Sequence, residues 1–74
     1  MKTPSLYQQL LYLRANMPKL SNWEKGFVRE MLEGRHGQGG LSGLGSDPSN
    51  TLVMEYTTDK QVDTIRRLYA TAVV

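Results

Sequence analysis

Cysteine is absent from this chain of 74 residues, and so are long hydrophobic runs. Without cysteine there can be no disulfide framework, thiolate zinc site or cysteine nucleophile. No window approaches the roughly 18 consecutive apolar residues of a membrane-spanning helix, and the N-terminus lacks the basic, then apolar, then small-residue order of a signal peptide. We therefore expect a soluble, cytoplasmic protein.

An excess of charge of one sign is lacking too. Nine Lys and Arg residues against seven Asp and Glu residues give a net charge of +2, so basicity alone does not indicate nucleic-acid binding. The length predicts one small domain, residues 1–74, and excludes a multi-domain enzyme. A core of this size rarely contributes more than a few kcal/mol, so a bound partner could stabilise the fold.

The first predicted helix spans about residues 4–16. Thr3 can cap an exposed amide, Pro4 suits the first helical position, and Pro18 ends the helix. The apolar positions share one narrow stripe formed by Leu6, Leu10, Leu13 and Met17. This spacing is typical of the core face of a helix.

A capping box of Ser21 and Glu24 predicts a second helix over about residues 22–33. Its expected buried face consists of Trp23, Phe27 and Met31, widened by Val28 and Leu32. Gly26 lies inside this helix, where glycine costs roughly 0.5–1 kcal/mol relative to alanine. It either marks a close backbone contact or is tolerated.

A second capping box, of Thr58 and Gln61, predicts a third helix over about residues 59–72. Its expected buried face consists of Val62, Ile65, Tyr69 and Ala72, flanked by Leu68 and Val73. Asp63 and Arg67 are four residues apart, so an ion pair on the exposed side is expected.

Six of the seven glycines lie between residues 34 and 50, which predicts a flexible loop that could become ordered on a partner. Residues 51–56 are too few to assign by periodicity, and we expect extended structure there. The predicted fold is therefore mainly α. It is a small three-helix domain with a glycine-rich flexible loop between the second and third helices and one short extended segment.

Residues that could carry catalysis are few. His36 is the only histidine, and it lies in the glycine-rich stretch, where nothing holds it near a proton. Glu24 has a capping role, while Glu30 and Glu33 read as solvated helix residues. The run Gly39–Gly45 lacks the preceding strand, following helix and Lys-Ser/Thr pair of a phosphate-binding loop. We predict no enzymatic activity, metal or cofactor.

Three residues beside the main stripe of the first helix are candidates for partner binding. Tyr7, Leu11 and Arg14 combine an aromatic, an aliphatic and an arginine, which is the composition of a binding hot spot. The alternative is that the third predicted helix covers them as part of the core.

Basic residues near both ends of the chain form the second candidate. Arg66 and Arg67 with Lys60 and Lys2 would make a patch for an acidic or nucleic-acid surface. The alternative is an ordinary solvated helix face.

The first two predicted helices and the short turn between them also have the spacing of a helix-turn-helix. Asn22, Lys25 and Arg29 would face DNA, but Glu30 and Glu33 would meet phosphates with the wrong sign. A plain helical hairpin is the alternative.

Several short stretches together resemble a known family. They are Leu20–Glu24 with Phe27 and Leu32, a variable insert, Thr58–Gln61 with Ile65, Leu68 and Tyr69, and the opening Met1–Pro4. In these stretches, in length and in the lack of cysteine, the chain resembles the small transcription regulators of lytic Xanthomonas phages, which bind the host RNA polymerase.

The resemblance implies a protein that binds the β and β′ subunits of bacterial RNA polymerase in the cytoplasm of the infected host. Such a protein displaces sigma factor, inhibits initiation and can suppress termination. The resemblance assigns no single residue, so the expected contacts come from the physical argument: Lys2, Tyr7, Leu11, Arg14, Arg66 and Arg67. We expect a monomer when free. The alternatives are a helix-turn-helix repressor that binds DNA and an antagonist of another host enzyme.

Overall fold

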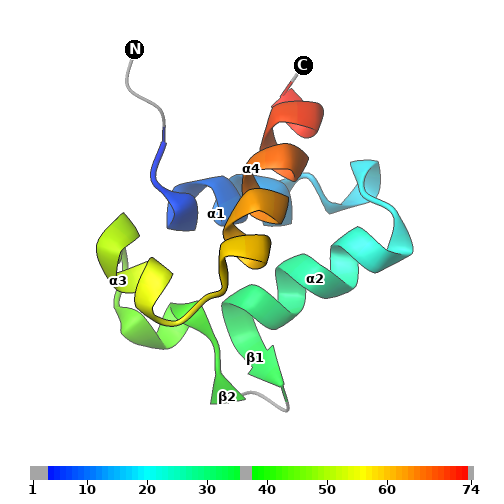
Figure 1. Cartoon of the computed structure of the whole chain (residues 1–74). Coiled ribbons are helices and arrows are strands. Elements are labelled where there is room, and N and C mark those ends of the chain that lie inside the picture. Colours follow the sequence, from blue (N-terminus) through cyan, green and yellow to red (C-terminus); the bar gives the residue numbers. More distant parts are fainter. Residues whose placement is uncertain (1–3, 36–37, 74) are drawn as a thin grey trace.

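The computed structural model describes residues 4–35 and 38–73, and these form a mainly helical fold with four α-helices (Figure 1). The elements in chain order are α1 (Leu6–Ala15), η1 (Met17–Lys19), α2 (Asn22–Glu33), β1 (Gly34–Arg35), β2 (Gln38–Gly39), η2 (Leu41–Leu44), α3 (Asn50–Glu55) and α4 (Asp59–Val73). The predicted helical class is confirmed, but α3 is an α-helix that the sequence did not predict.

Helix α1 begins two residues later than predicted, at Leu6. Its N-cap is Ser5, whose hydroxyl accepts from the Gln8 amide at 3.2 Å, while the Gln8 side chain accepts from the Ser5 amide at 3.4 Å. This reciprocal pair is a capping box, which the prediction missed because it placed the cap at Thr3 and the first helical residue at Pro4. Thr3 itself lies outside the described residues. Because two amides are satisfied at once, Ser5 sets the start of the helix.

Helix α2 begins and ends where the sequence predicted. The Ser21 amide donates to Glu24 Oε1 at 2.7 Å, and the Glu24 amide donates to Ser21 Oγ at 3.3 Å. The helix ends at Gly34, whose φ of 77° lies in the left-handed region that favours glycine.

Helix α3 replaces the extended segment expected at residues 51–56, so that prediction is wrong. Ser49 caps the helix by accepting from the Leu52 amide at 3.2 Å, and Val53 is fully buried. Asn50 also links α3 to α1, because its side-chain oxygen accepts from the Leu6 amide at 2.7 Å. A six-residue helix is too short to show periodicity, so its cap and its contact with α1 decide the conformation.

Helix α4 has the predicted capping box, with Thr58 and Gln61 bonded to each other's amides at 2.8 and 3.1 Å. The predicted ion pair is also present, with Arg67 Nε 3.0 Å from Asp63 Oδ2. The helix runs to Val73, one residue beyond the predicted end.

Within the predicted glycine-rich loop, residues 34–35 and 38–50 form more local structure than expected. Strands β1 and β2 pair antiparallel, with Gly34 opposite Gly39. The 3-10 helix η2 follows and packs on α2, where Leu41 is buried and Ser42 Oγ donates to the Leu32 carbonyl oxygen at 2.6 Å. The prediction of a flexible loop was based on the glycine content and did not anticipate that Leu41 is buried in the core.

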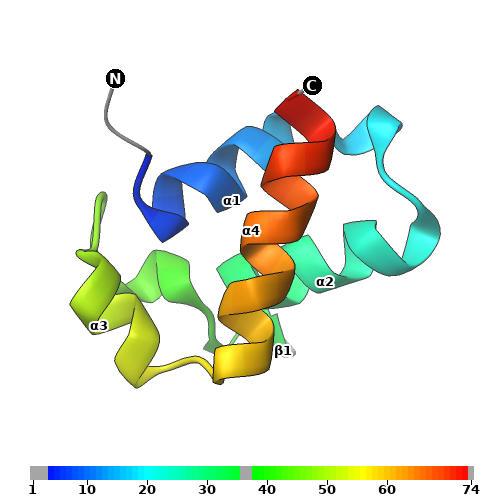
Figure 2. The same ribbon diagram turned by 45° about the horizontal axis from the view of Figure 1, so that its top comes forward.

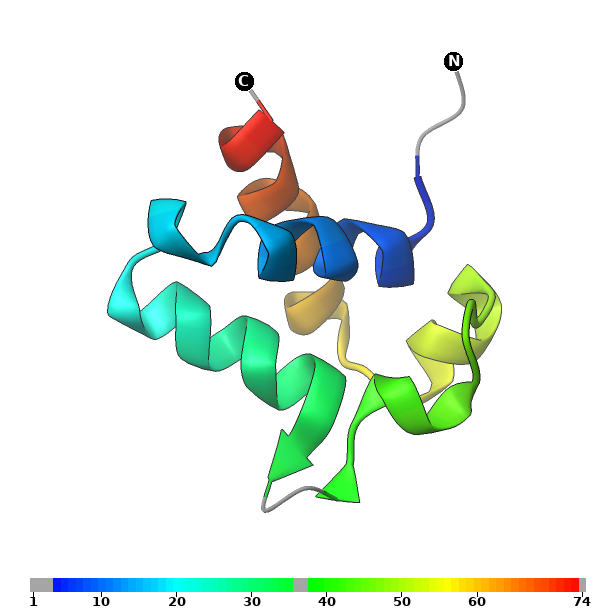
Figure 3. The same ribbon diagram turned by 180° about the vertical axis from the view of Figure 1, so that it is seen from behind.

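The core surrounds α1, which packs against α2, α3 and α4 (Figures 2 and 3). Helix α4 crosses α1 in Figure 2, and the view from behind in Figure 3 shows α2 next to α1 with α4 at the back. The buried apolar residues are Leu6, Tyr7, Leu10, Leu13, Leu20, Val28, Met31, Leu32, Leu41, Val53, Val62, Ile65 and Leu68. The predicted stripe of the first helix is therefore buried, apart from Met17, which is half-buried at its edge.

Candidate protein-binding groove

The candidate anchors on α1 lie in different environments. Tyr7 is only 6% exposed and belongs to the core, and Leu11 is half-buried against that core. Arg14 is exposed in the last turn of α1. The structure therefore shows the core alternative for Tyr7, since a ring buried by its own chain cannot offer free area to a partner.

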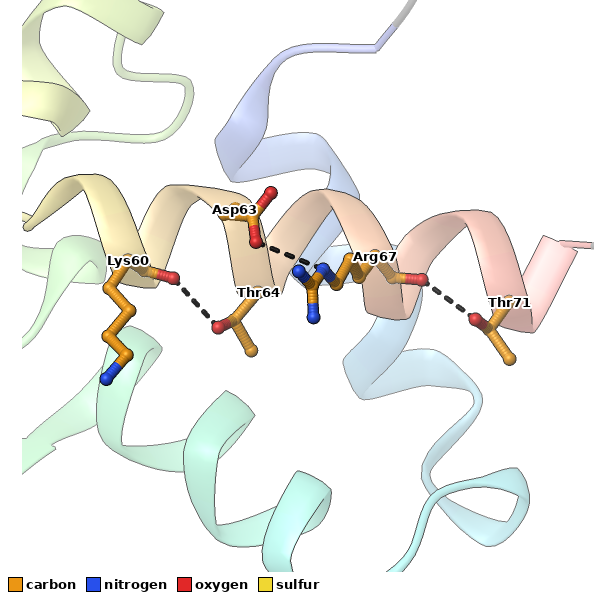
Figure 4. A network of polar contacts seen from close by, with 5 residues as sticks. All are labelled: Lys60, Asp63, Thr64, Arg67 and Thr71. Atoms are coloured by element: carbon orange, nitrogen blue, oxygen red, sulfur yellow. Dashed lines mark hydrogen bonds and ion pairs between the residues drawn. The ribbon is translucent and has the colours of Figure 1, made fainter.

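The predicted basic patch on α4 is interrupted by carboxylates. Arg67 is exposed and paired with Asp63, as Figure 4 shows. Arg66 is exposed and lines a small depression together with Asp59 and Asp63. Lys60 lines a different hollow. Arg66 and Arg67 thus share their surface with acidic groups.

Lys2 and His36, named above as candidates, lie outside the described residues. The helix-turn-helix residues Asn22 and Arg29 are exposed on α2, and Lys25 is half-buried. Glu30 on the same helix is exposed as well, so the charge conflict expected for DNA is present in the structure.

An open groove of about 1060 Å³ lies between α2 and the first turns of α4. One wall is a stripe of α2 that runs from Asn22 to Gly34. The opposite wall comes from Thr58, Lys60, Gln61 and Thr64, with Tyr56 in the turn before α4. The groove exists because α2 and α4 both pack on α1 and leave this side open.

The aromatic stripe of α2 is exposed at one end and buried at the other. Trp23 is 67% exposed, Phe27 is half-buried and Met31 is buried. The prediction of one continuous buried face was therefore wrong for Trp23. The core covers Val28 and Leu32, a neighbouring face, so only the C-terminal end of the stripe reaches it.

Three aromatic side chains, Trp23, Phe27 and Tyr56, line the groove. The rings of Trp23 and Phe27 stack, with centroids 5.6 Å apart and planes 13° apart. Tyr56 is 64% exposed and lines the same groove. Large aromatic side chains that are exposed at a concave surface are typical anchors of protein recognition.

The groove carries one charge of each sign. Lys60 extends from α4 on the side of α2 (Figure 4), and Glu30 lies on the α2 wall. Among the side chains that the structure describes, the one ion pair is Asp63 with Arg67, so Lys60 and Glu30 both remain available. The two charges have opposite signs, and both apolar and polar side chains line the groove.

Comparison of the chain with family models, curated proteins and solved structures found no match. Within residues 4–35 and 38–73, no cluster of three His, Asp or Glu side chains could hold a metal ion, and no helix is long and apolar enough to cross a membrane. The interpretation of the groove as a binding site therefore depends only on its shape and its lining residues.

Sequence reasoning missed Trp23, Gly26 and Tyr56 as groove residues. Trp23 has the spacing of a core residue, and Tyr56 was assigned to an extended segment of unknown surroundings. The signal that could have found the groove is Gly26, a glycine inside a helix on the same stripe as the aromatics.

Proposed function

We propose that this chain is a non-enzymatic regulator that binds the β and β′ subunits of bacterial RNA polymerase. It acts in the cytoplasm of an infected host, displaces sigma factor, inhibits initiation and can suppress termination. The choice of RNA polymerase as the partner comes from the resemblance to the phage regulators. The observation that supports a protein-binding role is the groove with Trp23 stacked on Phe27 and Tyr56 exposed nearby.

The aromatic groove is a better anchor than the residues of α1. Covering an exposed aromatic side chain contributes on the order of 2 kcal/mol, and Trp23 and Tyr56 are both available for this. Tyr7 is not, because it already contributes to the core. Arg14 and Leu11 remain candidates for the rim of a contact that extends over α1.

The test uses purified RNA polymerase core and holoenzyme with the tagged full chain. We expect the chain to retain core enzyme without sigma factor and to suppress promoter-dependent run-off transcripts. Trp23→Ala combined with Tyr56→Ala should weaken retention at least tenfold. Met54→Ala is the matched control, because Met54 is an exposed apolar residue outside the groove.

Two results would overturn this proposal. Failure of the wild-type chain to bind core or holoenzyme would remove the partner. Binding to duplex DNA that falls steeply with salt, and that is lost in Lys25→Ala with Arg29→Ala, would favour the helix-turn-helix alternative.

A further inference from the structure

Gly26 has no structural reason to be glycine within this chain. It lies in the middle of α2, and a Cβ added there would meet nothing within 4 Å. Its φ is not in the left-handed region, where only Gly34 and Gly45 are found among the described glycines. Glycine is nevertheless the least favourable helix residue after proline. Alanine at this position would make the fold more stable.

The position of Gly26 indicates what could occupy the open space above it in the groove. It lies on the groove wall, one turn before Glu30 and beside the stacked Trp23 and Phe27 rings. A glycine at such a place lets another backbone come close to the helix. The bare helix surface at Gly26 thus lies next to the most exposed aromatic side chain of the protein.

The charges of the groove limit the chemistry of its occupant. Lys60 would attract a carboxylate, and Glu30 on the other wall would attract an ammonium or guanidinium group. A nucleic-acid strand carries one sign of charge only, so Glu30 would repel it. A polypeptide can present both signs together with apolar side chains for the rings.

We infer that the groove binds a short polypeptide segment of the partner, whose backbone passes over Gly26 and whose apolar side chains cover Trp23 and Tyr56. An acidic residue of this segment pairs with Lys60 and a basic residue pairs with Glu30. The inference rests on the proposed function for the role of the complex. It adds the chemistry of the recognised segment, and it assigns Gly26 as the residue that gives the backbone access.

The experiment selects a displayed library of random 12-residue peptides on the full chain and measures the enriched peptides by fluorescence anisotropy. The decisive variant is Gly26→Ala. It should raise the melting temperature by about 2–8 °C, because alanine favours the helix, and should weaken peptide binding at least tenfold. Gly43→Ala is the control, since a Cβ there also meets nothing within 4 Å and Gly43 lies outside the groove; it should leave binding unchanged.

Charge variants test the predicted polarity. Lys60→Glu should select against peptides with an acidic residue beside the apolar anchor, and Glu30→Lys should select against those with a basic residue. Absence of enriched peptides would overturn the inference. Equal affinity for the wild type and Gly26→Ala, or binding that survives Trp23→Ala, would also overturn it.

The two proposals can fail separately. Selected peptides that depend on Gly26 and Trp23, together with no retention of RNA polymerase, would refute the proposed partner and leave the groove assignment standing. If the chain retains RNA polymerase and neither Gly26→Ala nor Trp23→Ala changes this retention, the groove assignment is refuted and the proposed partner stands. A 20-nucleotide single-stranded DNA serves as a further probe, and tight binding of it in the groove would refute a polypeptide occupant.

Discussion

Replacing Gly40 by alanine tests the packing of η2 on α2. A Cβ at Gly40 would collide with the Leu32 carbonyl oxygen and the Glu33 carbonyl carbon, and would lie 2.7 Å from the Glu33 Cα. Real Cβ atoms essentially never come within 3.0 Å of a heavy atom of a residue that is not a chain neighbour. The obstructing atoms belong to the backbone of α2, so no side chain can turn away. The variant must move η2 off α2.

The expected cost follows from what holds η2 in place. Leu41 is buried there, and Ser42 Oγ bonds to the Leu32 carbonyl oxygen at 2.6 Å. Overpacking costs about 1–3 kcal/mol. Relieving it by moving η2 would instead expose a leucine, about 1.5–3 kcal/mol, and break a hydrogen bond, about 1 kcal/mol. We expect Gly40→Ala to lower the free energy of unfolding by about 3 kcal/mol, out of a total on the order of 4–11 kcal/mol for a chain this long.

Urea titration followed by far-ultraviolet circular dichroism measures this loss. The matched control is Gly43→Ala in the same 3-10 helix, where a Cβ meets nothing within 4 Å. The control should stay within about 0.5 kcal/mol of the wild type. If Gly40→Ala unfolds within about 1 kcal/mol of the wild type, η2 does not press on α2 and the reasoning is refuted.

Substitutions at three further positions test the core, a helix cap and the surface. Ile65→Ala should lower the free energy of unfolding by about 2–5 kcal/mol in the same titration, because Ile65 is fully buried; a loss below 1 kcal/mol would mean that α4 is not packed on the core. Ser49→Ala should cost about 1 kcal/mol, since its hydroxyl caps α3, whereas Ser49→Asp should restore the cap; equal loss in both would contradict a capping role. Arg67→Ala should change the melting temperature by less than about 4 °C, because the pair with Asp63 is exposed, and a larger drop would show a buried role.

Local signals in the sequence predicted the helices that carry them. Ser21 with Glu24 and Thr58 with Gln61 each satisfy amides within one turn of chain, so the starts of α2 and α4 needed no knowledge of the rest of the fold. The predicted start of α1 was two residues too early because the cap was assigned to Thr3 with Pro4 rather than to Ser5.

Short elements depended on neighbours far away in the sequence. Helix α3 is stabilised by a bond between Asn50 and the Leu6 amide and by burial of Val53. Helix η2 depends on a place for Leu41 beside α2. No window of six residues contains that information, since an isolated helix of this length is not stable in water.

Local sequence signals predict the helical class, both ends of α2, the start of α4 and the ion pair on α4, because each follows from contacts within one or two turns. Which aromatic side chains are buried depends instead on how the helices pack together. Tyr7 and Trp23 both have helical spacing, yet Tyr7 lies in the core and Trp23 lines a groove. The difference arises because α2, α3 and α4 pack around α1 and leave one side of α2 uncovered. Periodicity shows which residues share a face, but only packing shows which face meets another element.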